Sequence, residues 1–132
     1  MKRARVLLAD DHRRVAEALR EILMVDFELV GTVEDGESLL IAAEQLQPDV
    51  IVADVSMPRL SGLSALPEIK RKNPNARVVL ITMYDEPAFA RLALEAGASG
   101  FVLKHSAQDQ LNTAVHAALD GKIYVSPGIA PL

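Results

Sequence analysis

The chain has 132 residues, and half of them are hydrophobic, which is enough apolar mass for one globular domain with a buried core. Its net charge of −4, without a long block of basic residues, does not fit a nucleic-acid-binding domain. The lack of cysteine excludes disulfides, thiol catalysis and thiolate metal sites. The apolar runs are far shorter than the roughly 18 residues of a membrane span. Asp10 and Asp11 interrupt the first run too early for a secretory signal, so we expect a cytoplasmic protein.

Five short apolar runs rich in β-branched residues have the length of buried strands. They are residues 6–9, 29–33, 50–53, 78–82 and 100–103. Apolar residues recur with helical spacing after each run, most clearly in the first and last helices, at Val15, Ala18, Leu19, Ile22, Leu23 and at Leu111, Ala114, Val115, Ala118, Leu119. Alternating strands and helices require crossover connections. We therefore predict a doubly wound α/β domain, (βα)5, whose five-stranded parallel sheet is covered on both faces.

Proline, glycine and charge mark several element boundaries. Pro67 predicts that the third helix starts late enough to hold this residue in its first turn. The basic run at residues 70–72 fits the last turn of that helix, where cations suit the helix dipole. After Gly121 the sequence loses helical periodicity and gains proline and glycine. We therefore expect a domain over residues 1–121, followed over residues 122–132 by a frayed tail or the start of a linker.

Polar side chains follow four of the five predicted strands, whereas the second strand leads into an ordinary turn. In chain order they are Asp10, Asp11, Asp54, Thr82, Tyr84 and Lys104. Each has a modest explanation when taken alone, such as a helix cap for Asp11 or a half-buried aromatic for Tyr84. However, ligands of parallel α/β sheets bind beyond the carboxyl ends of the strands. The joint arrangement therefore predicts a functional site at this edge.

The chemistry of this edge follows from its three carboxylates. Two carboxylates about 4 Å apart repel by roughly 4 kcal/mol at an effective dielectric of 20. Either one stays protonated, or a hard cation such as Mg²⁺, which suits carboxylates, water and phosphate, neutralises the cluster. A carboxylate can also attack phosphorus to form an aspartyl phosphate, while the metal, Lys104 and Thr82 neutralise the transferred group. Asp54 is the best candidate nucleophile because it stands alone on its strand.

Four motifs within residues 4–126 resemble the receiver domain of two-component response regulators. They are LLADDH, DVIVADVSMPRLSGL, VVLITMYDE and AGASGFVLK. The resemblance implies a flavodoxin-like sheet with the strand order 2-1-3-4-5. The stretches LADDH, TMYDE and AALDGKIYVSP are similar to receivers of the NarL/FixJ-like subfamily, which precede a LuxR-type helix-turn-helix domain.

The resemblance also implies a role for each residue of the site. Asp54 is the phosphoacceptor, and Asp54, Asp11 and the backbone carbonyl of Ser56 are direct Mg²⁺ ligands. Asp10 acts on the metal through a water molecule. Thr82 and Lys104 bind the phosphoryl group, and Thr82 and Tyr84 form the conformational switch. His105 departs from the family pattern, because many receivers have a cis proline after the lysine, and it leaves the isomer of the Lys104–His105 peptide open.

The partners implied by the resemblance are a sensor histidine kinase and a second copy of the chain, in a phosphorylation-dependent homodimer. By fold-level analogy, kinase choice is expected on the first helix, near Arg13, Arg14 and residues 16–18. DNA would be reached only through an output domain that is absent from this sequence. We expect either an excised receiver of a longer regulator or a stand-alone receiver that acts through protein contacts.

Other functional classes fit the sequence less well. An aspartate-based phosphohydrolase would use the same nucleophile and metal, but such enzymes usually carry a second acid where this chain has Ser56. The glycine-rich phosphate-binding motifs of nucleotide-binding proteins do not occur. Asp10 and Asp11 would repel the phosphate of a flavin. We therefore predict a signalling domain that catalyses only its own phosphorylation and dephosphorylation.

Overall fold

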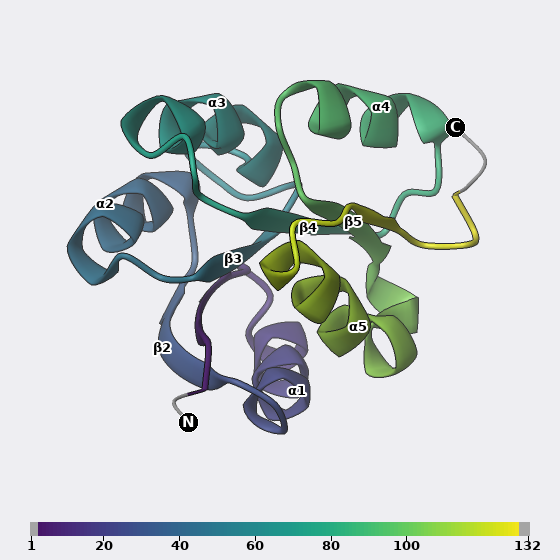
Figure 1. Cartoon of the computed structure of the whole chain (residues 1–132), viewed down its shortest axis with the longest axis horizontal. Coiled ribbons are helices and arrows are strands. Elements are labelled where there is room, and N and C mark those ends of the chain that lie inside the picture. The colour runs from purple at the N-terminus through teal and green to yellow at the C-terminus, as the bar shows by residue number, and fades with distance from the viewer. Residues whose placement is uncertain (1–2, 130–132) are drawn as a thin grey trace.

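A computed structural model describes residues 3–129 as one sheet with helices on both faces (Figure 1). The strands are β1 (Arg5–Ala9), β2 (Glu28–Val33), β3 (Val50–Asp54), β4 (Val78–Thr82), β5 (Gly100–Leu103) and β6 (Tyr124–Val125). The helices are α1 (Arg13–Met24), α2 (Gly36–Leu46), α3 (Gly62–Lys72), α4 (Pro87–Glu95) and α5 (Ala107–Leu119), with a short 3-10 turn, η1 (Lys104–Ser106), before α5. All paired strands are parallel, in the order β2-β1-β3-β4-β5-β6. The predicted doubly wound α/β architecture is confirmed.

The predicted number of strands was wrong, because β6 adds a sixth strand beside β5. Tyr124 and Val125 pair with Gly100 and Phe101, and Ile129 is only 3% exposed. A two-residue strand is too short to show a hydrophobic period, and its position depends on backbone hydrogen bonds to an exposed sheet edge. The predicted tail is therefore ordered against the sheet up to residue 129, whereas its residues 130–132 lie outside the described part of the chain.

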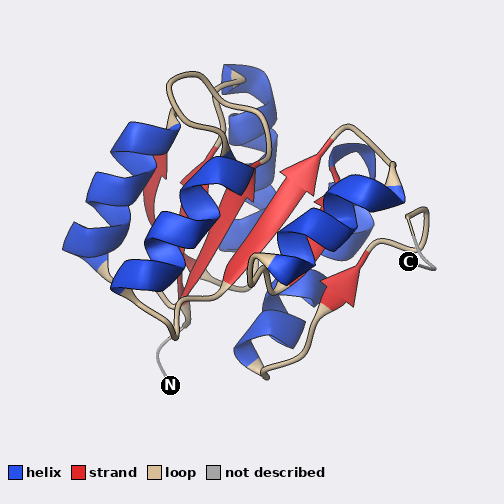
Figure 2. Cartoon of the chain, turned by 90° about the horizontal axis from the view of Figure 1, so that it is seen from above, coloured by secondary structure: helices blue, strands red, loops and turns tan. Residues whose placement is uncertain are grey.

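Helices lie on both faces of the sheet (Figure 2), and the core consists of two layers of side chains, one on each face. Side chains alternate along each strand, so on β1 Val6 and Leu8 pack with α1 and α5, whereas Leu7 and Ala9 pack with the residues of α2, α3 and α4. All four side chains are 0% exposed. Burial on both faces explains why the central strands are apolar at nearly every position. It also makes the carboxyl ends of these strands rigid supports for polar side chains.

Helix α3 begins earlier than the sequence predicted. Ser61 caps it by accepting a hydrogen bond from the Ser64 N–H at 3.0 Å, and the Gly62 N–H bonds the Val55 carbonyl at 3.1 Å. Pro67 therefore lies inside the helix and not in its first turn, so that prediction was wrong. The cap and the contact of Gly62 with the end of β3 fix the helix start. Pro67 is exposed and has no N–H to donate to the preceding turn of the helix.

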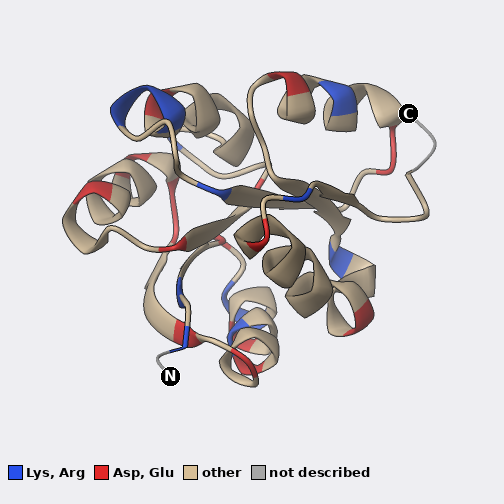
Figure 3. Cartoon of the chain, in the orientation of Figure 1, with Lys and Arg blue, Asp and Glu red and all other residues tan. Residues whose placement is uncertain are grey.

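Charged residues are distributed over the helices and loops of the molecule (Figure 3). The basic residues 70–72 lie in the last turn of α3, as predicted. Within residues 3–129, the helices lack the combination of length and hydrophobicity needed to cross a bilayer.

Gly62 offers a test of how closely α3 approaches β3. A Cβ atom at this position would lie 2.1 Å from the backbone oxygen of Asp54. Backbone cannot yield as a flexible side chain can, so we expect Gly62→Ala to lower the unfolding free energy by about 1–3 kcal/mol. Urea denaturation followed by circular dichroism measures this loss. Gly128→Ala is the control, because its Cβ would meet only the end of the Leu103 side chain, at 3.1 Å. Equal stability of both variants would contradict the close approach.

Candidate functional site

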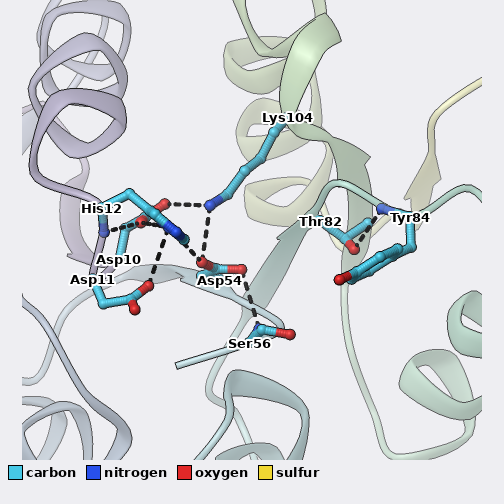
Figure 4. Close-up of polar contacts among 8 residues, drawn as sticks. All are labelled: Asp10, Asp11, His12, Asp54, Ser56, Thr82, Tyr84 and Lys104. Atoms are coloured by element: carbon cyan, nitrogen blue, oxygen red, sulfur yellow. Dashed lines mark hydrogen bonds and ion pairs between the residues drawn. The ribbon is translucent and has the colours of Figure 1, made fainter. Parts of the chain in front are cut away.

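The carboxyl ends of β1, β3 and β5 bring two aspartates and a lysine together (Figure 4). The Lys104 Nζ lies 2.8 Å from Asp54 Oδ2 and 2.9 Å from Asp10 Oδ2. Asp10 is 1% exposed and Asp54 is 4% exposed, so both carboxylates are almost entirely removed from water. Buried charges of one sign require an opposite charge nearby. Lys104 supplies this charge to both aspartates at once.

Backbone N–H groups hold the remaining carboxylate oxygens. Asp54 Oδ1 accepts a hydrogen bond from the Ser56 N–H at 3.1 Å, and Asp10 Oδ1 accepts one from the His12 N–H at 2.8 Å. Asp10 Oδ2 is buried and makes no hydrogen bond within the described chain, because Lys104 approaches it as an ion pair outside hydrogen-bond geometry. The Asp10 carboxylate therefore faces the Lys104 ammonium with one oxygen and the His12 N–H with the other.

His12 is a member of the site that sequence reasoning did not identify. Its Nδ1 lies 3.2 Å from Asp11 Oδ1, 3.3 Å from Asp10 Oδ1 and 3.7 Å from Asp54 Oδ2. His12 is also the N-cap residue of α1, so the alternative role of Asp11 as that cap is wrong. The position of His12 directly after the acidic pair was the signal in the sequence. Its side chain places a second nitrogen group among the three carboxylates (Figure 4).

The environment shifts the titration of the two central groups. Burial raises the pKa of Asp54, against the opposing effects of the hydrogen bonds from Lys104 and from the Ser56 N–H, and the charge of Asp10 raises it further. Burial by itself would lower the pKa of Lys104, but its close contacts and charge interactions with Asp54 and Asp10 raise it overall. Lys104 therefore stays a cation at neutral pH. The raised pKa of Asp54 shows that Lys104 compensates the buried carboxylate only in part.

The donor set suits a hard divalent cation. Asp10, Asp11, His12 and Asp54 each offer one ligand atom, and these atoms lie within 4.8 Å of one another. The three carboxylates of this cluster are accompanied by one lysine, which leaves excess negative charge. Carboxylate oxygens are the ligands that Mg²⁺ prefers, and Mg²⁺ needs only one or two of them. The residues present therefore fit the predicted metal.

Thr82 and Tyr84 lie beside the carboxylates without touching them. Thr82 is 1% exposed at the end of β4, where it pairs with Leu103 of β5. Its hydroxyl accepts a hydrogen bond from the Tyr84 N–H at 3.0 Å. Figure 4 shows the Tyr84 ring beside Thr82, without a contact to the carboxylates. Tyr84 is 53% exposed, and the centroid of its ring lies 6.2 Å from that of Phe89.

A second contact outside the predicted set supports the β3–α3 loop. Asp35 caps α2 by accepting a hydrogen bond from the Ser38 N–H at 2.8 Å, which lowers the pKa of Asp35. Its Oδ2 lies 3.8 Å from Nη1 of Arg59, which has a left-handed backbone with φ of 68°. The sequence around Asp35 indicates only an ordinary turn between β2 and α2, so it did not predict this ion pair with a residue far along the chain. It links the loop after Asp54 to α2.

Comparisons with known proteins agree with this geometry. A family profile described as the response regulator receiver domain matches residues 6–116. The chain is 36% identical to the response regulator GacA of Pseudomonas protegens and 32% identical to the transcriptional regulatory protein DegU of Brevibacillus brevis. These alignments cover 96% and 94% of the chain but only 60% and 53% of the two relatives. A LuxR-family response regulator from Aurantimonas superimposes with a TM-score of 0.93 at 34% identity, over 97% of this chain and 93% of that one.

The raised pKa of Asp54 predicts that this residue costs stability. A carboxyl whose pKa is higher in the folded state favours unfolding when it ionises, and this cost vanishes below its unfolded pKa near 3.8. In buffer free of divalent cations, Asp54→Asn should therefore be more stable than the wild type at pH 7, by about 0.5–2 kcal/mol. This gain should shrink as the pH falls toward 4.

Thermal or urea denaturation at several pH values measures the difference. Asp85→Asn is the control, because Asp85 is an exposed loop carboxylate without an ion pair in the described structure, and it should change stability little. A less stable Asp54→Asn at pH 7 would show that Lys104 compensates Asp54 fully.

Proposed function

The chain belongs to the response regulator receiver domain family of two-component signalling, and we propose that Asp54 is its phosphoacceptor and a sensor histidine kinase its phosphodonor. Receiver domains are signalling modules and not classical enzymes. The observation that supports Asp54 most directly is the contact of its buried carboxylate with the Lys104 ammonium at 2.8 Å. A buried, partly compensated carboxylate at the end of a rigid strand is well placed to act as a nucleophile.

The proposed transfer is a displacement at phosphorus. One Asp54 oxygen forms the new P–O bond, and the bond from phosphorus to the donor nitrogen of the kinase histidine, or to the acetate of acetyl phosphate, breaks. The electron pair of that bond leaves with the donor. Lys104 stays protonated during the transfer, and its positive charge stabilises the negative charge on the phosphoryl oxygens. The chain would catalyse only its own phosphorylation and the later hydrolysis.

Mg²⁺ is the proposed cofactor of this transfer. The residues that would hold it are Asp11, Asp54 and the backbone carbonyl of Ser56, with Asp10 acting through water. When bound, the ion neutralises charge on the carboxylates and on the phosphoryl oxygens. The excess of carboxylates over cations in the cluster supports this assignment.

Thr82 and Tyr84 are the proposed switch. The Thr82 hydroxyl accepts one hydrogen bond, from the Tyr84 N–H, and donates none within residues 3–129, so its proton is available to a phosphoryl oxygen. Movement of Thr82 toward Asp54 would leave space that the exposed Tyr84 ring can enter. Phosphorylation shifts the populations of the two conformations only as far as it stabilises one of them more than the other. About 5.5 kcal/mol of such differential stabilisation is needed to change their ratio from 1:99 to 99:1.

The proposed output is a phosphorylation-dependent homodimer or an attached transcriptional domain. Both curated relatives named above are regulators, and one is called a transcriptional regulatory protein. Because the chain spans only 53% and 60% of their length, DNA would be reached through a domain outside the matched region. A stand-alone receiver that signals through protein contacts is the alternative.

Intact-mass spectrometry tests the phosphoacceptor. After incubation with acetyl phosphate and Mg²⁺, we expect the wild type to gain the mass of one phosphoryl group and Asp54→Asn to gain none. Asp85→Asn, which alters an exposed carboxylate outside the site, should be labelled like the wild type. An unlabelled wild type, under conditions that label another receiver, would refute the proposal.

Isothermal titration calorimetry tests the metal assignment. Removal of one direct carboxylate ligand should cost more than about 1.4 kcal/mol, so we expect Asp11→Ala to weaken Mg²⁺ binding by at least about tenfold. Asp35→Ala removes an aspartate that caps α2 and is not among the clustered ligand atoms, and it should bind Mg²⁺ like the wild type. Unchanged affinity of Asp11→Ala would exclude Asp11 as a ligand.

A further inference from the structure

Ser126 is a fully buried hydroxyl residue in the segment after α5. It is 0% exposed, and its N–H donates to the Phe101 carbonyl of β5 at 3.0 Å. Its Oγ accepts a hydrogen bond from the Leu103 N–H at 3.0 Å and donates to Oε1 of Gln110 on α5. One side chain therefore joins the end of β5, the following helix and the last described segment of the chain.

The Ser126 hydroxyl replaces a backbone group in the β5–β6 ladder. In a parallel pair, the next rung after Ser126 N–H to Phe101 O would run from the Leu103 N–H to the Ser126 carbonyl. That carbonyl instead accepts a hydrogen bond from the Ile129 N–H at 2.9 Å, in the turn that follows. The Ser126 hydroxyl therefore accepts the hydrogen bond from the Leu103 N–H in place of the carbonyl. Without this hydroxyl, the buried Leu103 N–H would have no partner, which is costly.

Leu103 is the last residue of β5 and directly precedes Lys104. At Lys104 the chain leaves the sheet into η1, and from there the ammonium reaches Asp54 and Asp10 at 2.8 and 2.9 Å. The Leu103 N–H is therefore an anchor immediately before the residue that compensates both buried carboxylates. A shift of the backbone at Leu103 by about 1 Å would move Lys104 relative to the two carboxylates, and displacements of this size are large enough to slow a reaction.

We propose that Ser126 is a positioning residue for Lys104, which it fixes through the Leu103 N–H, and that residues 122–129 are thus part of the phosphoacceptor machinery. This inference rests on the proposed function of Asp54 and Lys104. It extends the working domain beyond the boundary at residue 121 that the sequence predicts. It also connects the phosphorylation site to the segment after α5 through the hydrogen bonds of Ser126.

The test compares Ser126→Ala with Ser126→Thr in the full chain. Loss of one buried hydrogen bond at the anchor should lower the rate of phosphorylation at saturating acetyl phosphate about three- to tenfold in Ser126→Ala. Ser126→Thr keeps the hydroxyl and should restore most of the rate. In the metal-free protein, amide hydrogen exchange of Leu103, followed by NMR, should accelerate in Ser126→Ala and recover in Ser126→Thr.

Two controls separate positioning from stability. Ser99→Ala makes the same change at the other end of β5, where the side chain has no hydrogen bond in the described structure, and should leave the rate unchanged. Asn112→Ala removes the hydrogen bond from Nδ2 to the Ile22 carbonyl, 2.7 Å long, between α5 and α1. It should destabilise the fold without slowing phosphorylation.

Gln110→Ala is a milder variant for the case in which Ser126→Ala does not fold. It removes only the acceptor of the Ser126 hydroxyl and should slow phosphorylation about two- to threefold. If Ser126→Ala is labelled at the wild-type rate, or is slowed no more than Asn112→Ala, the inference is overturned and Asp54 remains the phosphoacceptor. A wild type that is not labelled at Asp54 overturns the proposed function, and this inference with it.

Discussion

The ammonium group of Lys104 lies between two carboxylates that the fold has almost entirely removed from water, and the functional edge of the sheet depends on this contact. Asp10 and Asp54 approach the same nitrogen from neighbouring strands, so one cation offsets two buried anions. The compensation is incomplete, because Asp11 adds a third carboxylate to the cluster. Such an imbalance is a cost for folding, which a bound divalent cation would offset.

The rest of the molecule supplies rigidity to this edge. Apolar side chains on both faces hold the strands, and α3 begins so close to β3 that only glycine fits at residue 62. On the far side, β6 completes the ladder of β5 up to Leu103, the residue before Lys104. The packed strands therefore hold the carboxylates close together, so the electrostatic repulsion between these groups is not relieved by a movement of the backbone.

Sequence reasoning succeeded where the signal was local and repeated. Apolar runs of strand length and the helical periods gave the architecture, and the polar residues after the strands gave the cluster of Asp10, Asp11, Asp54 and Lys104. It failed where the deciding contact was distant. The helix containing Pro67 starts early because Gly62 meets β3. His12 was missed for another reason, since it directly follows the acidic pair but only the turn into α1 brings its side chain against the carboxylates. β6 was missed because a strand of two residues is too short to show a hydrophobic period in the sequence.

The sequence by itself determined the order of elements, the parallel sheet and the residues that gather at its carboxyl edge, because hydrophobic period and strand-end position are properties of neighbouring residues. Only the tertiary structure decided which nitrogen compensates which carboxylate, that Thr82 and Tyr84 stand apart from the cluster, and that Ser126 completes the ladder beside Lys104. These outcomes depend on distances between segments far apart in the chain, and on how much water the packed helices exclude from the space between them.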